Sequence, residues 1–114
     1  MVSKQPLFGL VVAATFATGC ISDAPASGDR GELLFNNNCT PCHAEMGEGA
    51  QNIEAPNIAG LPEWYVLAQL EKFQQGVRGT HFDDIPGMRM RPMSRTLESA
   101  EDTKLTANYV ARLP

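Results

Sequence analysis

Residues 39–43 read Cys-Thr-Pro-Cys-His, and this short run limits what the chain can fold into more than any other stretch. Two thiols three positions apart in one helical turn can each add to one of the two neighbouring vinyl groups of a porphyrin. The residue that follows is then carried under the iron. A C-x-x-C-H run is the attachment signature of haem c. The run therefore predicts one covalent haem c, bound through Cys39 and Cys42, with His43 as an axial ligand.

Two other uses of the thiol pair are weaker. A structural zinc site needs four ligands at suitable spacings, and beyond this run the chain offers only Cys20 and His81. A thioredoxin-like redox pair would lie near a βαβ pattern, and the sequence has no such pattern. We therefore favour the haem over both.

The second axial ligand of a haem c is commonly a methionine, which raises the reduction potential. The candidates in the downstream stretch are Met88, Met90 and Met93. If that stretch is extended, alternate side chains face opposite ways, so Arg89 and Arg91 stay in water while the sulfur of Met90 turns to the iron. This argument favours Met90 and leaves Met93 as the alternative.

The N-terminal stretch has the features of an export signal. Lys4 precedes the almost wholly apolar run Pro6–Thr18, which is too short to span a bilayer, so residues 1–19 are predicted to be a signal peptide. Its last residues, Ala-Thr-Gly-Cys, resemble the lipobox of bacterial lipoproteins. We expect a lipid on Cys20, a flexible linker over residues 20–28 and a membrane-anchored protein on the periplasmic side. The alternative is ordinary cleavage that leaves a free thiol.

The charge of the chain narrows the choice of partners. Lys4 is the only charged residue of the signal peptide, so after cleavage eight Lys and Arg face thirteen Asp and Glu and the formal charge moves from −4 to −5. An acidic chain argues against nucleic acid as a partner and against simple adsorption to anionic lipid. We expect redox proteins as partners.

The domain, residues 29–114, is predicted to be all-α. Nothing in it resembles a strand, and the expected helices run from the N-cap Asp29 to the haem motif, over Pro62–Gly76 and over about Glu98–Arg112. Ala44–Gly60 and Val77–Thr96 show no period and are predicted to be loops. Loops of this length are uncommon unless they are functional, and folding over a haem would account for them.

Three residues near the predicted site receive expectations of their own. The carbonyl of Pro56 is expected to accept a hydrogen bond from the second ring nitrogen of His43, which fixes the tautomer. Trp64 continues the apolar stripe of its helix and is expected in the core. The hydroxyl of Tyr65 is the better candidate to reach a haem propionate.

Taken together, these features resemble a class I cytochrome c, most closely one module of the bacterial tandem dihaem cytochromes c. The resemblance covers about residues 28–114 and rests on Cys39–His43, Ala55–Gly60, Gly76–Gly79, Met90–Met93 and Tyr109–Ala111. It implies a small cytochrome c fold in which three main helices and two long loops wrap around one covalent haem. In that family the first and last helices cross near a glycine and two aromatic residues, which match Gly31, Phe35 and Tyr109. From the sequence alone, Gly31 either permits a close helix approach or is simply tolerated near a helix end.

The resemblance also bears on the ligands. The spacing to Leu97 in the dihaem modules selects Met90, whereas the spacing to Tyr109 in other class I cytochromes selects Met93. Arg78 matches a Gly-x-Arg pattern, which implies that it neutralises a haem propionate.

A haem with two protein ligands leaves no position for a substrate. We therefore expect an electron carrier of a respiratory chain, with no small-molecule substrate and no enzymatic activity. One alternative is a gas-binding or peroxide-reacting haem protein with a labile distal ligand, a role open to His81. Another is a fixed haem subunit of a larger respiratory complex. For docking, we expect the cationic residues Arg89, Arg91 and Arg95 to meet an acidic patch on the redox partner.

Overall fold

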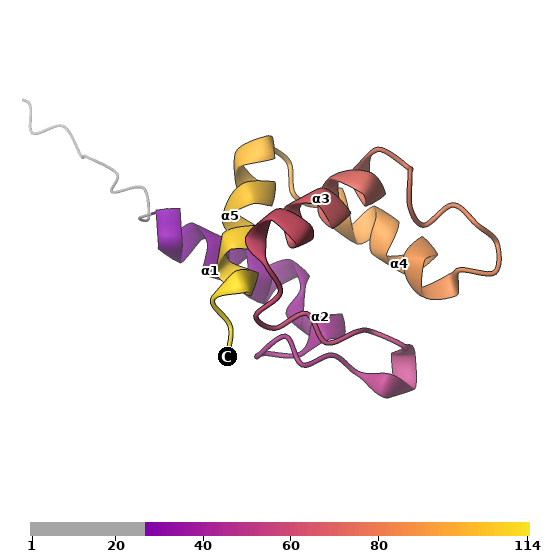
Figure 1. The fold of residues 1–114 in the computed structure, drawn as a ribbon, viewed down its shortest axis with the longest axis horizontal. Coiled ribbons are helices and arrows are strands. Elements are labelled where there is room, and N and C mark those ends of the chain that lie inside the picture. The colour runs from indigo at the N-terminus through magenta and orange to yellow at the C-terminus, as the bar shows by residue number, and fades with distance from the viewer. Residues whose placement is uncertain (1–26) are drawn as a thin grey trace, which may run out of the picture.

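The computed structural model describes residues 27–114, which are helical apart from loops and one isolated bridge between Ala50 and Ala55. In chain order the elements are α1 (Ser27–Asn38), α2 (Thr40–His43), the 3-10 helix η1 (Gln51–Ile53), α3 (Glu63–Gln74), α4 (Ile85–Ser94) and α5 (Ala100–Ala111). The all-α prediction is confirmed (Figure 1). Within residues 27–114, every helix is too short or too polar to serve as a membrane span.

The first helix begins earlier than predicted. α1 includes Ser27 and Gly28, which the sequence analysis had assigned to the linker, and Asp29 lies inside the first turn. The predicted signal peptide, Cys20 and the rest of the linker lie outside the described residues.

α1 and α5 cross at close range (Figure 1). A Cβ atom on Gly31 would collide with the carbonyl oxygen of Leu105, so glycine permits the approach. One turn further on, Phe35 is completely buried, and its ring centroid lies 5.4 Å from that of Tyr109. The crossing at one glycine and two aromatic residues is confirmed, and the question left open for Gly31 is answered in favour of close approach.

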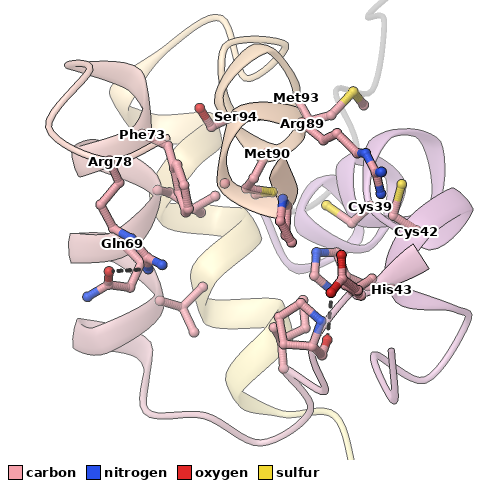
Figure 2. Close-up of a pocket in the computed structure, with 18 of the residues that line it drawn as sticks. Cys39, Cys42, His43, Gln69, Phe73, Arg78, Arg89, Met90, Met93 and Ser94 are labelled. Atoms are coloured by element: carbon pink, nitrogen blue, oxygen red, sulfur yellow. Dashed lines mark hydrogen bonds between the residues drawn. The ribbon is translucent and has the colours of Figure 1, made fainter. Parts of the chain in front are cut away.

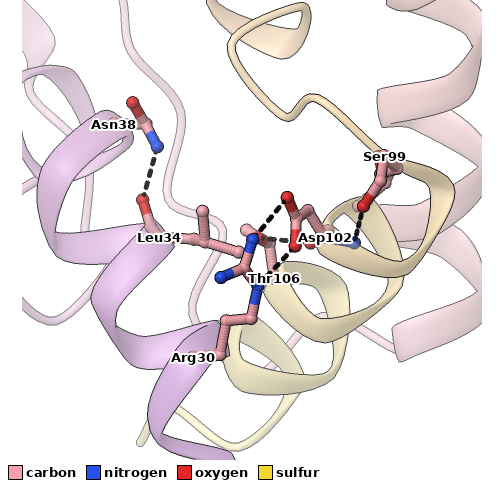
Figure 3. Close-up of polar contacts among 7 residues, drawn as sticks. Arg30, Leu34, Asn38, Ser99, Asp102 and Thr106 are labelled. Atoms are coloured by element: carbon pink, nitrogen blue, oxygen red, sulfur yellow. Dashed lines mark hydrogen bonds and ion pairs between the residues drawn. The ribbon is translucent and has the colours of Figure 1, made fainter. Parts of the chain in front are cut away.

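A side-chain ion pair joins the same two helices (Figure 3). The Arg30 guanidinium donates from Nε to Asp102 Oδ1 at 2.6 Å and from Nη2 to Oδ2 at 2.9 Å. The hydrogen bonds from Arg30 are the main cause of a lowered pKa at Asp102, which is buried. The backbone amide of Asp102 donates to Ser99 Oγ at 3.0 Å, which caps the first turn of α5.

One apolar core joins α1, α3 and α5. Its buried members are Phe35, Val66, Leu70, Leu97, Ala107, Val110 and Leu113. The prediction that Trp64 lies in this core is wrong, because its side chain is 72% exposed. α3 turns Val66, Leu70 and Phe73 inward, and a residue two positions before Val66 lies about 200° around the helix from it.

α3 ends as its sequence predicts. Gly76 has a φ of 75° and follows the C-cap residue. The amide of Gly76 donates to Phe73 O at 3.2 Å and the amide of Val77 donates to Lys72 O at 2.8 Å. These two bonds form a Schellman motif. Pro62 is the N-cap rather than the first helical residue.

The prediction of an unbroken loop over Val77–Thr96 is wrong, because α4 occupies its second half. The helix begins after Asp84, whose carboxylate accepts a hydrogen bond from the amide of Gly87 at 2.9 Å. Pro86 in the first turn loses nothing, since its missing N–H would have no partner inside the helix. Pro92 inside the helix removes one backbone hydrogen bond. Proline is strongly disfavoured in a helix interior, so helix propensities alone do not predict this helix.

Candidate haem site

A cavity of about 640 Å³ lies between α2 with its following loop and α4, with α3 along one side. Its surface is mostly apolar, and its volume falls within the range of about 300–1,000 Å³ that is usual for bound cofactors. Figure 2 shows side chains from all of these elements converging on it. The cavity is therefore large enough and dry enough for a flat apolar group.

One wall holds the haem-binding motif. Cys39, Cys42 and His43 all line the cavity, and His43 is buried. α2 follows α1 after a single residue, and the amide of His43 donates to Cys39 O at 2.9 Å, so the motif keeps helical spacing. Burial, assisted by the nearby Cys42, raises the pKa of the Cys39 thiol to about 12. Both thiols are free and half-buried.

A backbone carbonyl fixes the histidine. His43 Nδ1 lies 2.9 Å from Pro56 O (Figure 2). A carbonyl oxygen only accepts hydrogen bonds, so Nδ1 must carry the proton. His43 Nε2 then keeps a free lone pair, which is the form that binds a metal. The contact with Pro56 that the sequence predicted is present.

The loop after His43 contains only η1 and is otherwise irregular, as predicted. It begins with Ala44 at φ 64° and ψ 171°, a backbone region that residues other than glycine rarely adopt. The amide of Gly49 donates to His43 O at 2.8 Å, and the amide of Ile58 donates to Gly47 O at 2.8 Å. These bonds hold the loop as one wall of the cavity.

α4 supplies the opposite wall and both predicted methionine ligands. Met90 and Met93 line the cavity, and Met90 also packs against the core (Figure 2). Met88 is 45% exposed and lies outside the lining. The prediction of an extended backbone around Met90 is wrong, because the segment is helical. Its position in the helix nevertheless places it at the cavity.

Met90 belongs to a stripe of residues that was not predicted from the sequence. Gly87, Ser94 and Leu97 are buried and also line the cavity. Gly87, Met90 and Ser94 follow at spacings of three and four residues, which places them on one face of α4, and Leu97 lies just beyond its end. In a predicted helix this spacing would have marked the inner face, but Pro92 argued against a helix here.

The three arginines proposed for docking do not form one surface. Arg89 is exposed and lines the cavity, whereas Arg91 is partly buried beside Gly76 with no hydrogen-bond partner for its Nε. Arg95 donates from Nε and Nη2 to Gln74 O at 3.1 and 3.0 Å. A helix places residues two apart on opposite sides, so Arg89 faces away from the other two.

The expected propionate residues lie at the cavity. Tyr65 and Arg78 both line it. Arg78 donates from Nη1 to Gln69 Oε1 at 2.8 Å, and its guanidinium lies 4.6 Å from the centre of the Phe73 ring (Figure 2). Gln69 was not singled out from the sequence, because a polar residue on a helix gives no sign that it faces a cavity.

His81 is away from the cavity. It does not belong to the lining, and its side chain is 68% exposed. Its ring stacks on Phe82 with centroids 4.8 Å apart, and its Nδ1 accepts a hydrogen bond from the amide of Asp83 at 3.2 Å. Nothing in this position prepares it for a role at a haem.

The cavity and its walls define the class of protein. An all-helical domain that places two thiols and a carbonyl-bound histidine on one wall of an apolar cavity, and thioethers on the other, is a c-type haem protein. The chain belongs to the cytochrome c family, which it matches over residues 28–114. Family membership and the spacing of Cys39 and Cys42 imply one covalent haem c and haem-based electron transfer, as the sequence predicted.

The chain is also similar to part of two longer relatives. It is 30% identical to the cbb3-type cytochrome c oxidase subunit CcoP of Rubrivivax gelatinosus over 83 residues, which are 73% of this chain and 25% of the relative. It is 34% identical to the thiosulfate dehydrogenase electron acceptor of Thiomonas intermedia (strain K12) over 71 residues, which are 62% of this chain and 30% of the relative. The chain therefore spans less than a third of either relative. No solved structure matched it.

Proposed function

We propose that this protein is a one-electron carrier with a His/Met-ligated haem c. Cys39 and Cys42 form the thioether bonds, His43 binds the iron through Nε2, and Met90 is the second axial ligand. The single observation that carries the proposal is the cavity of about 640 Å³, which these four residues line from two facing walls. Tyr65 and Arg78, which also line the cavity, would meet the propionates.

The bound haem supplies reversible one-electron chemistry between ferrous and ferric iron. The chain's own residues account for the rest. The bond from His43 to Pro56 orients the imidazole and makes it a stronger ligand. Mostly apolar walls exclude water, which limits the charge rearrangement that accompanies electron transfer. With both axial positions held by protein, no substrate bond is made or broken.

The ligand assignment is tested by comparing Met90→Ala with Met93→Ala. Ligation by Met gives the ferric protein a weak absorption band near the red edge of the visible spectrum. We expect Met90→Ala to lose the band and Met93→Ala to keep it. Loss in Met93→Ala alone would transfer the role to Met93, and absence of the band in the unchanged protein would end the His/Met proposal.

Of the alternative functions, one gains support. A gas-binding or peroxide-reacting role lacks a distal histidine, since His81 lies outside the cavity. A fixed haem subunit of a larger complex is favoured by the exposed Val77 and Phe82, which are 66% and 75% accessible, and by the name of the oxidase-subunit relative. Co-purification from detergent extracts tests it, because a free carrier purifies without partner subunits, whereas a fixed subunit purifies together with them.

We further propose that the chain is exported to the periplasmic side and anchored there by a lipid on Cys20. The support is the sequence, namely the charged start, the short apolar run and the lipobox-like end of residues 1–19. A mass spectrum of the purified protein tests it, because the haem and lipid adducts appear in one measurement. We expect Cys20→Ser to retain the haem mass and lose the lipid mass.

A further inference from the structure

One hydrogen bond connects the two walls of the cavity directly. Arg89 Nη1 donates to the carbonyl oxygen of Ile53 at 3.0 Å and so joins α4 to the end of η1. Among the hydrogen bonds of residues 27–114, no other connects α4 to the segment 44–61. That segment is otherwise tied to His43, through the amide of Gly49 and the carbonyl of Pro56, and to α5, through the amide of Gly60 and the carbonyl of Val110 at 3.1 Å.

The direction of the Arg89 side chain is particular to that residue. Figure 2 shows Arg89 reaching from α4 towards Cys42, beside Met93. Arg95, the residue that follows α4, reaches instead to the end of α3, where it donates to Gln74 O. The three arginines of this region therefore divide between two sides of α4, and only Arg89 crosses the cavity.

α4 is held to α3 by packing and by hydrogen bonds between Gln74 and the residues Ser94 and Arg95. The helix packs against α3 on one side and borders the cavity on the other. Asp84 caps its start but does not reach the opposite wall. On the cavity side, the spacing between α4 and the His43 wall is therefore set by the group in the cavity and by the bond from Arg89 to Ile53.

We propose that Arg89 is a positioning residue that acts as a clasp across the haem cavity. By holding α4 against the segment 44–61, it keeps the neighbouring Met90 over the iron and limits the opening of α4 that would let a small ligand displace the methionine. The clasp rests on the proposed ligation by Met90. A cationic donor suits the task, because hydrogen bonds from charged groups are stronger than neutral ones.

Binding of imidazole to the ferric holoprotein tests the clasp. Imidazole takes the place of Met only in molecules whose α4 has moved away, so its apparent affinity contains that opening equilibrium. Loss of one hydrogen bond from a charged donor should favour opening by roughly tenfold. We expect Arg89→Gln and Arg89→Leu to bind imidazole about tenfold more tightly, as measured by loss of the Met–iron band during titration.

Arg95→Gln is the matched control, because it removes the same charge and two hydrogen bonds at the end of the same helix, on the side away from the cavity. It should lower the melting temperature and leave the imidazole affinity unchanged. Imidazole titrations at low and high salt separate the loss of the hydrogen bond from the loss of the arginine charge. An effect of that charge on the iron is screened at high salt, whereas the loss of the hydrogen bond is not.

Each result of these titrations either supports or overturns the clasp. Tighter binding in both Arg89 variants that persists at high salt supports the clasp. Unchanged affinity, a gain that disappears at high salt, or an equal gain in Arg95→Gln overturns it while ligation by Met90 stands. If the unchanged protein lacks the Met–iron band before imidazole is added, the ligand assignment fails and the clasp fails with it.

Discussion

Ala44 carries the backbone away from the predicted iron ligand His43 in a conformation that suits glycine better. Its φ of 64° and ψ of 171° cost a residue with a Cβ atom about 1–3 kcal/mol. Glycine removes that strain but gains freedom in the unfolded chain, which costs about 0.5–1 kcal/mol. We expect Ala44→Gly to raise the free energy of unfolding by about 1 kcal/mol, measured by guanidinium chloride titration of the ferric protein.

Ala50, in the same loop, provides the control. Its φ of −146° and ψ of 112° are ordinary extended values. Ala50→Gly therefore relieves nothing and should lower the free energy of unfolding by about 0.5–1 kcal/mol. Equal losses in the two variants would show that Ala44 is not strained. The strain could not be foreseen from the sequence, because it arises where the turn after the haem motif must enter the loop.

At the scale of helices, the crossing of α1 and α5 depends on the missing side chain of Gly31. A methyl group there meets the Leu105 carbonyl, and forcing extra atoms into a packed contact typically costs about 1–3 kcal/mol. The gain in helix propensity, about 1 kcal/mol, offsets only part of this. We expect Gly31→Ala to lower the melting temperature of the holoprotein, whereas Asn37→Ala, on the exposed face of α1, should leave it unchanged or raise it.

The ion pair between the same helices makes stability depend on pH. Arg30 lowers the pKa of Asp102, so the stabilisation is present above the unfolded-state pKa, about 3.9 for Asp, and is lost as the pH falls through the lower folded-state pKa. We expect Asp102→Asn to melt at a lower temperature than the unchanged protein at pH 7. That difference should narrow below about pH 4. An equal difference at pH 7 and pH 3 would show that the charge on Asp102 is not what matters.

The helices and loops also show which parts of the structure could be predicted from the sequence. The haem motif is local, so helical spacing alone brings Cys39, Cys42 and His43 to one wall, and Gly76 marks the end of α3 by itself. α4 was missed because Pro92 lowers its intrinsic propensity, while its stability comes from the Asp84 cap and from packing on α3. Trp64 was misplaced because tertiary packing, not composition, decides which face of α3 turns inward.

For the whole molecule, the distribution of charge bears on partners. The chain is acidic, with a formal net charge of −4, yet Arg78 and Arg89 lie at the cavity. Arg91 is too buried to meet a partner freely, and Arg95 is turned to Gln74 on the side away from the cavity, which leaves Arg89 of the three arginines first considered. A partner with an acidic surface would be drawn to this side of the molecule, because complementary charge mainly speeds encounter.

Charge reversal tests that arrangement. We expect Arg89→Glu to slow electron transfer to an acidic natural partner by about tenfold at low ionic strength, within the range over which steering changes association rates. The difference should fade towards 1 M salt, where the Debye length is about 3 Å. Stopped-flow mixing across a salt series gives the rates. Arg112→Glu, exposed just after the end of α5, makes the same charge change without touching the cavity and should have a much smaller effect. Equal low-salt rates for Arg89→Glu and the unchanged protein, with every natural partner, would mean that partners approach the haem from another side.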